Sequence, residues 1–109
     1  WEIKITEKEY EFGVPPAPKS KSTTTFTISD NAGEVSDITI QGQDENGIYT
    51  MNGQRVKNAF YVVGEDKNGL NALSGTASIK NGEAKTFSAR GFRAENGYLS
   101  LIQFRGKKQ

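Results

Sequence analysis

The residues best suited to bind a ligand are aromatic and basic side chains in two stretches of the sequence. Arg55, Lys57 and Tyr61 fall in RVKNAFYVV, and Arg90 and Arg93 fall in ARGFRAENGY. A tyrosine ring packs against the apolar face of a sugar ring, and the cations bond its hydroxyl or carboxylate groups. The same side chains stack bases and hold phosphates in proteins that bind single-stranded nucleic acids. We predict that these five residues bind the ligand.

The first three of these residues would lie together if residues 55–63 formed one strand. Successive side chains of a strand point to opposite faces, so Arg55, Lys57 and Tyr61 would share one face. The opposite face would carry an apolar set: Val56, Phe60 and Val62. Because an apolar face packs against the core, we expect the tyrosine and the two cations to face solvent together.

Catalysis has little support in the residue types of this chain. Histidine and cysteine are both absent, which excludes Ser-His-Asp sites, Cys-His sites and zinc sites built from cysteine. Neither the Walker nor the Rossmann glycine pattern occurs. A pair of carboxylates is the one simple catalytic arrangement left, but the acidic residues fall mostly at turns. We therefore predict no catalytic residues and a protein that is not an enzyme.

Three acidic loops bear on metal binding: DNAGE, QDENG and EDKNG, at residues 30–34, 43–47 and 65–69. Their side chains supply the oxygen ligands that calcium prefers. None of them has the spacing or the distal glutamate of the twelve-residue calcium loop. We predict no cofactor and no metal-ligating residues, and we keep a structural calcium ion as the alternative.

The charge balance bears on which partners the chain attracts. Lysine and arginine number 14 and acidic side chains 13, so the net charge of +1 gives no global field for a polyanion. A nucleic acid or an acidic glycan would need a local basic patch, and we disfavour a nucleic acid as partner. No apolar run approaches the roughly 18 residues of a membrane-spanning helix, so we predict no membrane span.

These side chains must be positioned by β-strands, because apolar residues recur at every second position. In WEIKIT, for example, Trp1, Ile3 and Ile5 fall on one face and are expected to pack on the core. The alternation recurs in TTTFTIS, EVSDITIQG, RVKNAFYVV, LSGTASI and AKTFSARGF, while YLSLIQF is apolar on both faces, as in a central strand. No stretch has sustained helical periodicity. We predict seven to nine strands and no helix longer than two turns.

Asn-Gly pairs mark the turns between these strands. Asparagine and glycine tolerate the positive φ that both central residues of a type I′ turn require. We predict hairpins at Asn81-Gly82, Asn96-Gly97 and Asn52-Gly53. Two further pairs, Asn46-Gly47 and Asn68-Gly69, lie in polar clusters, which predicts longer loops there.

The fold predicted from these elements is a single all-β domain over residues 1–109, an antiparallel β-sandwich of immunoglobulin-like or jelly-roll-like type. The alternative is a small closed β-barrel like the oligonucleotide-binding (OB) fold. Three prolines in residues 13–22 exclude a central strand there, so we expect an extended segment that crosses from one sheet to the other or from one edge to the other. Residues 106–109 are expected to be a frayed tail.

The stretch GIYTMNGQRV, residues 47–56, resembles a phrase common near the ends of secreted and surface β-modules of Bacteroidetes-type bacteria. The residues after position 63 do not follow the rest of such a sorting module, so its role is not carried over. What the resemblance implies is an extracellular or cell-surface location. The chain also opens at Trp1 without an initiator methionine, which predicts a processed product or an excised domain.

Three functions are compatible with these features. The first is a non-catalytic extracellular binding module for a polysaccharide or glycan, carried by a larger secreted or surface protein. The second is a structural or adhesion module whose protein partners contact an exposed sheet. The third is an OB-type binder of single-stranded nucleic acid, which the near-neutral charge counts against. We take the first as the prediction and keep the other two as alternatives.

Overall fold

The computed structural model describes residues 1–31, 33–44, 47–66 and 69–109. Within these ranges the chain forms β-strands and no helix, as the period-two alternation predicts, and hence no helix that could cross a membrane. The strands are β1 (Glu2–Glu11), β2 (Ser20–Thr25), β3 (Thr27–Asp30), β4 (Val35–Asp44), β5 (Gly47–Val56), β6 (Ala59–Asp66), β7 (Gly69–Lys80), β8 (Glu83–Glu95) and β9 (Tyr98–Lys107).

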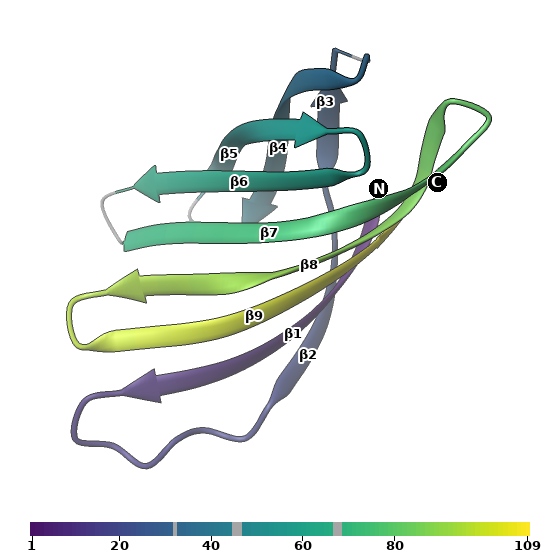
Figure 1. Ribbon diagram of the computed structural model, residues 1–109. Helices are drawn as coiled ribbons and strands as arrows, with labels where there is room; N and C mark the ends of the chain where they lie inside the picture. Colours follow the sequence, from purple (N-terminus) through teal and green to yellow (C-terminus); the bar gives the residue numbers. More distant parts are fainter. Residues whose placement is uncertain (32, 45–46, 67–68) are drawn as a thin grey trace.

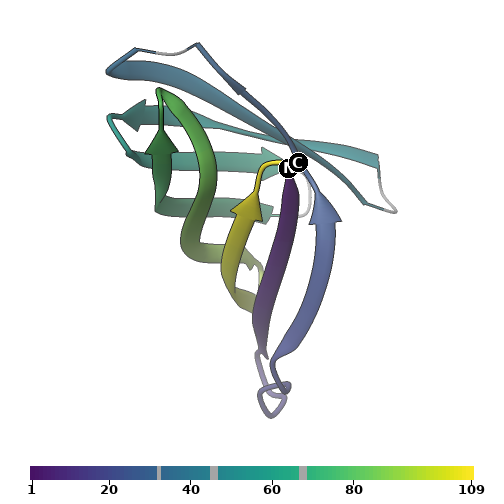
Figure 2. The ribbon, with the colours of Figure 1, turned by 90° about the vertical axis from the view of Figure 1, so that its right-hand side faces the viewer.

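All of these strands belong to one antiparallel sheet, in the order β2-β1-β9-β8-β7-β6-β5-β4-β3. From β3 to β9 each strand pairs with the next along the chain, and β9 also pairs with β1. The strands β2 and β3 stand at the two ends of this order, although Phe26 alone separates them in the sequence. The sheet is therefore strongly curled (Figures 1 and 2). The prediction of an all-β antiparallel fold is confirmed.

The concave face of the curled sheet holds the core. Phe26, between β2 and β3, is buried. Its ring packs edge-to-face on the rings of Phe104 and Tyr49, with ring centroids 5.3 Å and 6.1 Å apart. Such contacts are favourable because the positive edge of one ring meets the negative face of the other. The buried apolar residues come from every strand except β2 and β3: Ile3, Ile38, Ile40, Met51, Val62, Leu73, Phe87, Ala89 and Phe104.

Two of the predicted hairpins are present in the structure. Asn81 and Gly82 separate β7 from β8 and have φ values of 54° and 76°, both positive as a type I′ turn requires. Asn96 and Gly97 separate β8 from β9, with a φ of 77° at Gly97. The predictions for the pairs at 46–47 and 68–69 fall partly outside the described residues, and their glycines begin β5 and β7.

The predicted hairpin at Asn52-Gly53 is wrong, and so is the single strand over residues 55–63. Gly53 lies inside β5, and the chain turns instead at Lys57 and Asn58, where Lys57 has a φ of 55°. A Cβ atom at Gly53 would lie 1.7 Å from the backbone oxygen of Tyr61. The glycine is therefore needed because two backbones approach closely where the sheet curls, not because the chain reverses.

The expectations for the proline segment and the tail also need correction. Residues 13–22 do not cross between sheets, because β1 and β2 are neighbours in the single sheet and β2 already begins at Ser20. The tail is not frayed from residue 106, because backbone pairing continues beyond that position. The strand β9 extends to Lys107, and the backbone nitrogen of Lys108 donates to the backbone oxygen of Lys85 at 2.9 Å.

Candidate functional site

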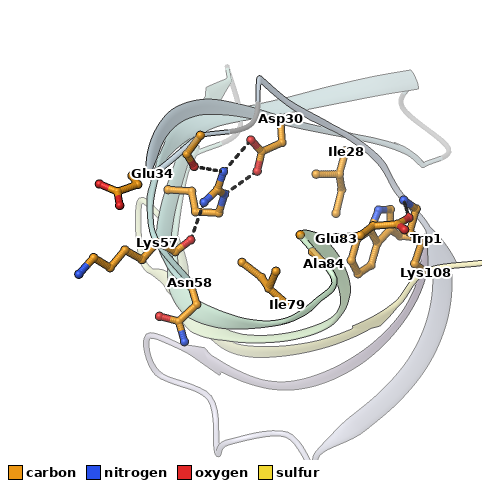
Figure 3. A pocket seen from close by; sticks show the side chains of 13 residues that line it. Trp1, Ile28, Asp30, Glu34, Lys57, Asn58, Ile79, Glu83, Ala84 and Lys108 are labelled. Carbon is orange, nitrogen blue, oxygen red and sulfur yellow. Dashed lines mark hydrogen bonds and ion pairs between the residues drawn. The ribbon is translucent and has the colours of Figure 1, made fainter.

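One end of the curled sheet opens into a pocket of about 740 Å³, which we call the mouth pocket. Figure 3 shows the sheet curving around it: Ile28, Asp30 and Ile79 point inward, whereas Glu34 and Lys57 extend away. Its wall combines the starts of β1 and β8, the strand β3, two turns and the C-terminal end. The lining residues are Trp1, Ile28, Asp30, Gly33, Glu34, Arg55, Lys57, Asn58, Ile79, Gly82, Glu83, Ala84 and Lys108.

Arg55 ties two parts of the pocket rim together. Its Nε donates to Oδ2 of Asp30 at 2.6 Å, and its Nη2 donates to Oδ1 at 3.1 Å. Its Nη2 also donates to the backbone oxygen of Gly33 at 2.9 Å, and its Nη1 donates to that of Lys57 at 2.5 Å. The guanidinium therefore joins the β3–β4 connection to the β5–β6 turn with the fixed geometry of a bidentate pair.

The ion pair between Arg55 and Asp30 is partly shielded from water, mainly on the side of the arginine. The Arg55 side chain is 11% exposed and that of Asp30 is 32% exposed. The buried hydroxyl of Ser36 donates to Oδ1 of Asp30 at 2.5 Å. The hydrogen bond to Asp30 raises the pKa of Arg55 above its ordinary value, which keeps the guanidinium charged. The pocket therefore has one charged and partly dry wall.

Trp1 supplies an aromatic wall, and its backbone is fixed. Its nitrogen donates to the backbone oxygen of Phe26 at 3.0 Å, and the nitrogen of Phe26 donates to the oxygen of Trp1 at 2.9 Å. The indole ring lies 5.3 Å from the ring of Phe87, at a tilt of 53°. Below it a smaller recess of about 50 Å³ is lined mainly by apolar side chains, among them Phe60 and Ala77. The floor of the pocket is therefore apolar.

Glu83 places a carboxylate at the rim, at the start of β8. Its side chain forms ion pairs with Lys108 and, at 3.0 Å, with Lys85. The hydrogen bonds from Lys108 and Lys85 lower the pKa of Glu83 from 4.5 to about 2. The rim is therefore charged on the side of Trp1 as well as on the side of Arg55.

The predicted ligand-binding residues of β5 and β6 do not share a face. Because the chain turns at Lys57, Arg55 is the register partner of Phe60 and faces the concave side. Tyr61 lies on the outer, convex side, where 48% of it is exposed. Lys57 sits in the turn, and Val56, predicted to be core, is exposed. The expectation that Arg55, Lys57 and Tyr61 face solvent together is wrong.

The two predicted residues of β8 also point to opposite faces. Arg90 and Tyr61 both have Ser74 as register partner, on either side of it, so they lie on the outer face two strands apart. Arg93 has the same parity as the buried Ala89, which places it on the concave side, and its register partner on β9 is Ser100. Their roles as ligand-binding residues stay predictions.

Sequence reasoning did not identify Trp1, Asp30 or Glu83 as residues of the mouth pocket. Trp1 was expected to pack on the core, and it does contact Phe87, but it also lines the opening. Asp30 belonged to the acidic loops considered for calcium, and nothing in its local sequence indicates a partner 25 residues away at Arg55. The alternation that placed Trp1 beside Ile3 was the one available signal for the aromatic wall.

Each of the three acidic loops includes residues outside the described ranges, at positions 32, 45–46 and 67–68. Among the residues that the structure does describe, no group of three or more acidic side chains is placed to hold a metal ion. The structural calcium ion therefore stays an untested alternative for these loops.

Comparison with known proteins adds no assignment. No protein-family model matches the chain, and no curated protein matches it with significant similarity. The functional argument therefore depends on the geometry of the pocket and of the sheet faces.

Proposed function

We propose that the protein is a non-catalytic glycan-binding module and that its site is the mouth pocket rather than the outer face of β6. The observation that carries this proposal is the combination of the Trp1 ring with paired charged groups around a cavity of about 740 Å³. Concave sites with an apolar lining and a few fixed polar groups are typical of small-ligand binding.

The chemistry of the lining suits a sugar ring. The indole of Trp1 offers a flat surface for the apolar face of a pyranose, as aromatic rings do in many recognition sites. The Arg55–Asp30 pair and Glu83 surround it with donors and acceptors for hydroxyl groups. Arg55 already donates hydrogen bonds to five oxygen atoms, which belong to Asp30, Gly33, Ser36 and Lys57. Because its side chain is fixed in this way, the pocket loses little conformational freedom when a ligand binds.

We also infer that the curled sheet is better described as a small barrel than as a two-sheet sandwich. The single sheet order supports this, because the residues of β2 and β3 form one stretch of chain interrupted only at Phe26. Curling a sheet in this way leaves an open end, and small barrels commonly bind ligands at such an end. The up-and-down order differs from the Greek key of the OB alternative.

An extracellular or cell-surface location, within a larger secreted or surface protein, is part of the same proposal. Its support is the resemblance of residues 47–56 to phrases of secreted β-modules. The composition is compatible with it, since a chain without cysteine folds alike in oxidising and reducing compartments.

The experiment is a glycan array followed by calorimetric titration of the best neutral oligosaccharide. Trp1→Ala should weaken binding about tenfold, since it removes the stacking surface, and Trp1→Phe should recover part of the loss. Tyr61→Ala, an aromatic truncation on the outer face, is the matched control and should leave the affinity unchanged. The proposal would be contradicted if the chain bound no glycan. It would also be contradicted if Tyr61→Ala lost affinity while Trp1→Ala kept it.

The second candidate function is a structural or adhesion module with protein partners. It is favoured by apolar side chains exposed on the outer face of β6, β8 and β9: Tyr61, Val63, Phe92, Leu99 and Leu101. Changing Val63 and Leu101 together to serine tests it. If this candidate is correct, the double variant loses the partner that the parent chain captures, while its glycan binding is unchanged.

A further inference from the structure

The outer face of four neighbouring strands carries a concentration of cations, which we call the basic face. The sheet order places β2, β1, β9 and β8 side by side. Their outward positions alternate with buried ones such as Ile3, Ala89 and Phe104. The cations at these outward positions are Lys21 on β2, Lys4 and Lys8 on β1, Arg105 and Lys107 on β9, and Arg90 on β8.

The charges of the basic face are not neutralised by neighbouring acids. In the described part of the chain, the ion pairs within 4.0 Å involve Arg55, Lys85 and Lys108, none of which belongs to this face. From Thr86 onward on β8 and along the whole of β2, β1 and β9, Glu2, beside Lys107 in the register, is the one acidic residue at an outward position. The net charge of +1 for the whole chain therefore conceals a strongly uneven distribution.

One pair in this face works against the stability of the sheet. Lys4 and Arg105 are direct register partners on β1 and β9. Like charges placed opposite each other destabilise an antiparallel pair, whereas opposite charges would stabilise it. The nearby Lys107, two positions from Arg105 on the same strand, lies opposite Glu2, which offsets its charge. A bound polyanion removes this cost, so the arrangement favours a charged ligand over bare solvent.

Polar side chains are interleaved with the cations in two rows that cross the strands. One row runs Lys21–Thr6–Gln103–Arg90, and the next runs Thr23–Lys4–Arg105–Ser88. With strands about 4.8 Å apart, each row is about 14 Å long. Hydroxyl and amide groups between cations bond sugar hydroxyls, while the cations bond sulfates or carboxylates.

We propose that the basic face binds a linear anionic polysaccharide, a sugar chain that carries sulfate or carboxylate groups. This site is separate from the mouth pocket and does not depend on the function proposed for it. The alternative polyanions fit less well. The two rows described above contain no aromatic side chain to stack a nucleic-acid base and no apolar side chain to enter a lipid surface. The row of Lys8 does continue into the exposed Leu101 and Phe92, so an oligonucleotide and lipid vesicles are included in the test.

The test measures binding of the intact chain to heparin, which carries sulfates, and to alginate, which carries carboxylates, with neutral dextran as the blank. We expect binding to at least one of the two polyanions and a fall in affinity as salt rises, because exposed charges are screened. The double variant Lys4→Ser and Arg105→Ser should lose at least tenfold in affinity. Its melting temperature should not fall, since the change removes a repulsive pair.

The matched control removes two exposed cations outside the basic face, with Lys57→Asn and Lys80→Ser, and should keep most of the affinity. Asparagine is chosen at position 57 because it tolerates positive φ. Failure to bind both polyanions overturns the proposal, as does an equal loss in the control. Tighter binding of a single-stranded oligonucleotide or of phosphatidylserine vesicles, with the same loss in the Lys4 and Arg105 variant, also overturns it in favour of that partner.

Discussion

Two arginines on the two faces of the sheet show how differently one residue type is used in this molecule. Arg55 points to the concave side, where Asp30 accepts two of its hydrogen bonds and two backbone oxygens accept others. Arg105 points outward and lies opposite another cation, Lys4. The first arginine holds the rim of a pocket in shape, whereas the second adds charge to a surface. We therefore propose that the inner face holds a ligand in a fixed pose and that the outer face attracts a polyanion through its charge.

The largest expected difference between the two faces is in the stability of the fold. Phe26→Ala should lower the free energy of unfolding by about 3–5 kcal/mol, because this ring is 1% exposed and packs against two other aromatic rings. Phe92→Ala, on the outer face with 38% of the residue exposed, should cost about 1 kcal/mol or less. Urea denaturation of both variants measures the difference, and similar losses would show that the faces are assigned incorrectly.

The two arginines themselves provide the next comparison. Arg55→Met removes the ion pair between positions 55 and 30, and should cost about 1–3 kcal/mol of unfolding free energy, the value of hydrogen bonds to charged groups. Arg105→Met should change stability by about 0.5 kcal/mol or less, because it removes an exposed charge next to Lys4. Denaturation by urea at low salt measures both. A larger loss for Arg105→Met would contradict the division between paired and unpaired charges.

The smallest expected effect concerns Glu83, whose pKa is lowered by its lysine partners from 4.5 to about 2. Because the pKa of the carboxylate is lowered in the folded state, the ion pairs contribute their full stabilisation above about pH 4.5. This contribution is lost as the pH falls to about 2. Glu83→Gln should therefore make the melting temperature less dependent on pH across this range. The effect should shrink at high salt, and an unchanged pH profile at low salt would count against these ion pairs in solution.

The strands of this fold could be predicted from the sequence because each depends on a local pattern. Alternating apolar residues indicated that Trp1, Ile3 and Ile5 pack on the core, and the pair Asn81-Gly82 indicated a hairpin. Ile3 is buried, Trp1 and Ile5 pack against the core, and the hairpin is present. The pair Asn52-Gly53 misled because the same glycine that suits a turn also suits a close approach of two backbones. A side chain at position 53 is excluded by the backbone of Tyr61 on the next strand. The sequence around Gly53 does not indicate that this strand lies so close.

The candidate sites depended on information that the local sequence lacks. Moving the turn to Lys57 reversed the face assigned to Arg55 relative to Phe60, since side chains alternate strictly along a strand. The contact between Arg55 and Asp30 joins positions 25 residues apart. The basic face requires β1 and β9 to be neighbours, which places Lys4 beside Arg105 from the other end of the chain. Pairing of the first and last strands follows from the topology, not from residue types.

The most direct test of the division between an inner sugar site and an outer polyanion site is a pair of titrations followed by ¹⁵N NMR. The neutral oligosaccharide should shift the indole N–H of Trp1 and the Nε–H of Arg55, while the amides of Lys4 and Arg105 stay in place. Heparin should produce the reverse pattern, with shifts at Lys4 and Arg105 and none at the indole of Trp1. Shifts from both ligands at the same residues would contradict the account, because one surface would then serve both.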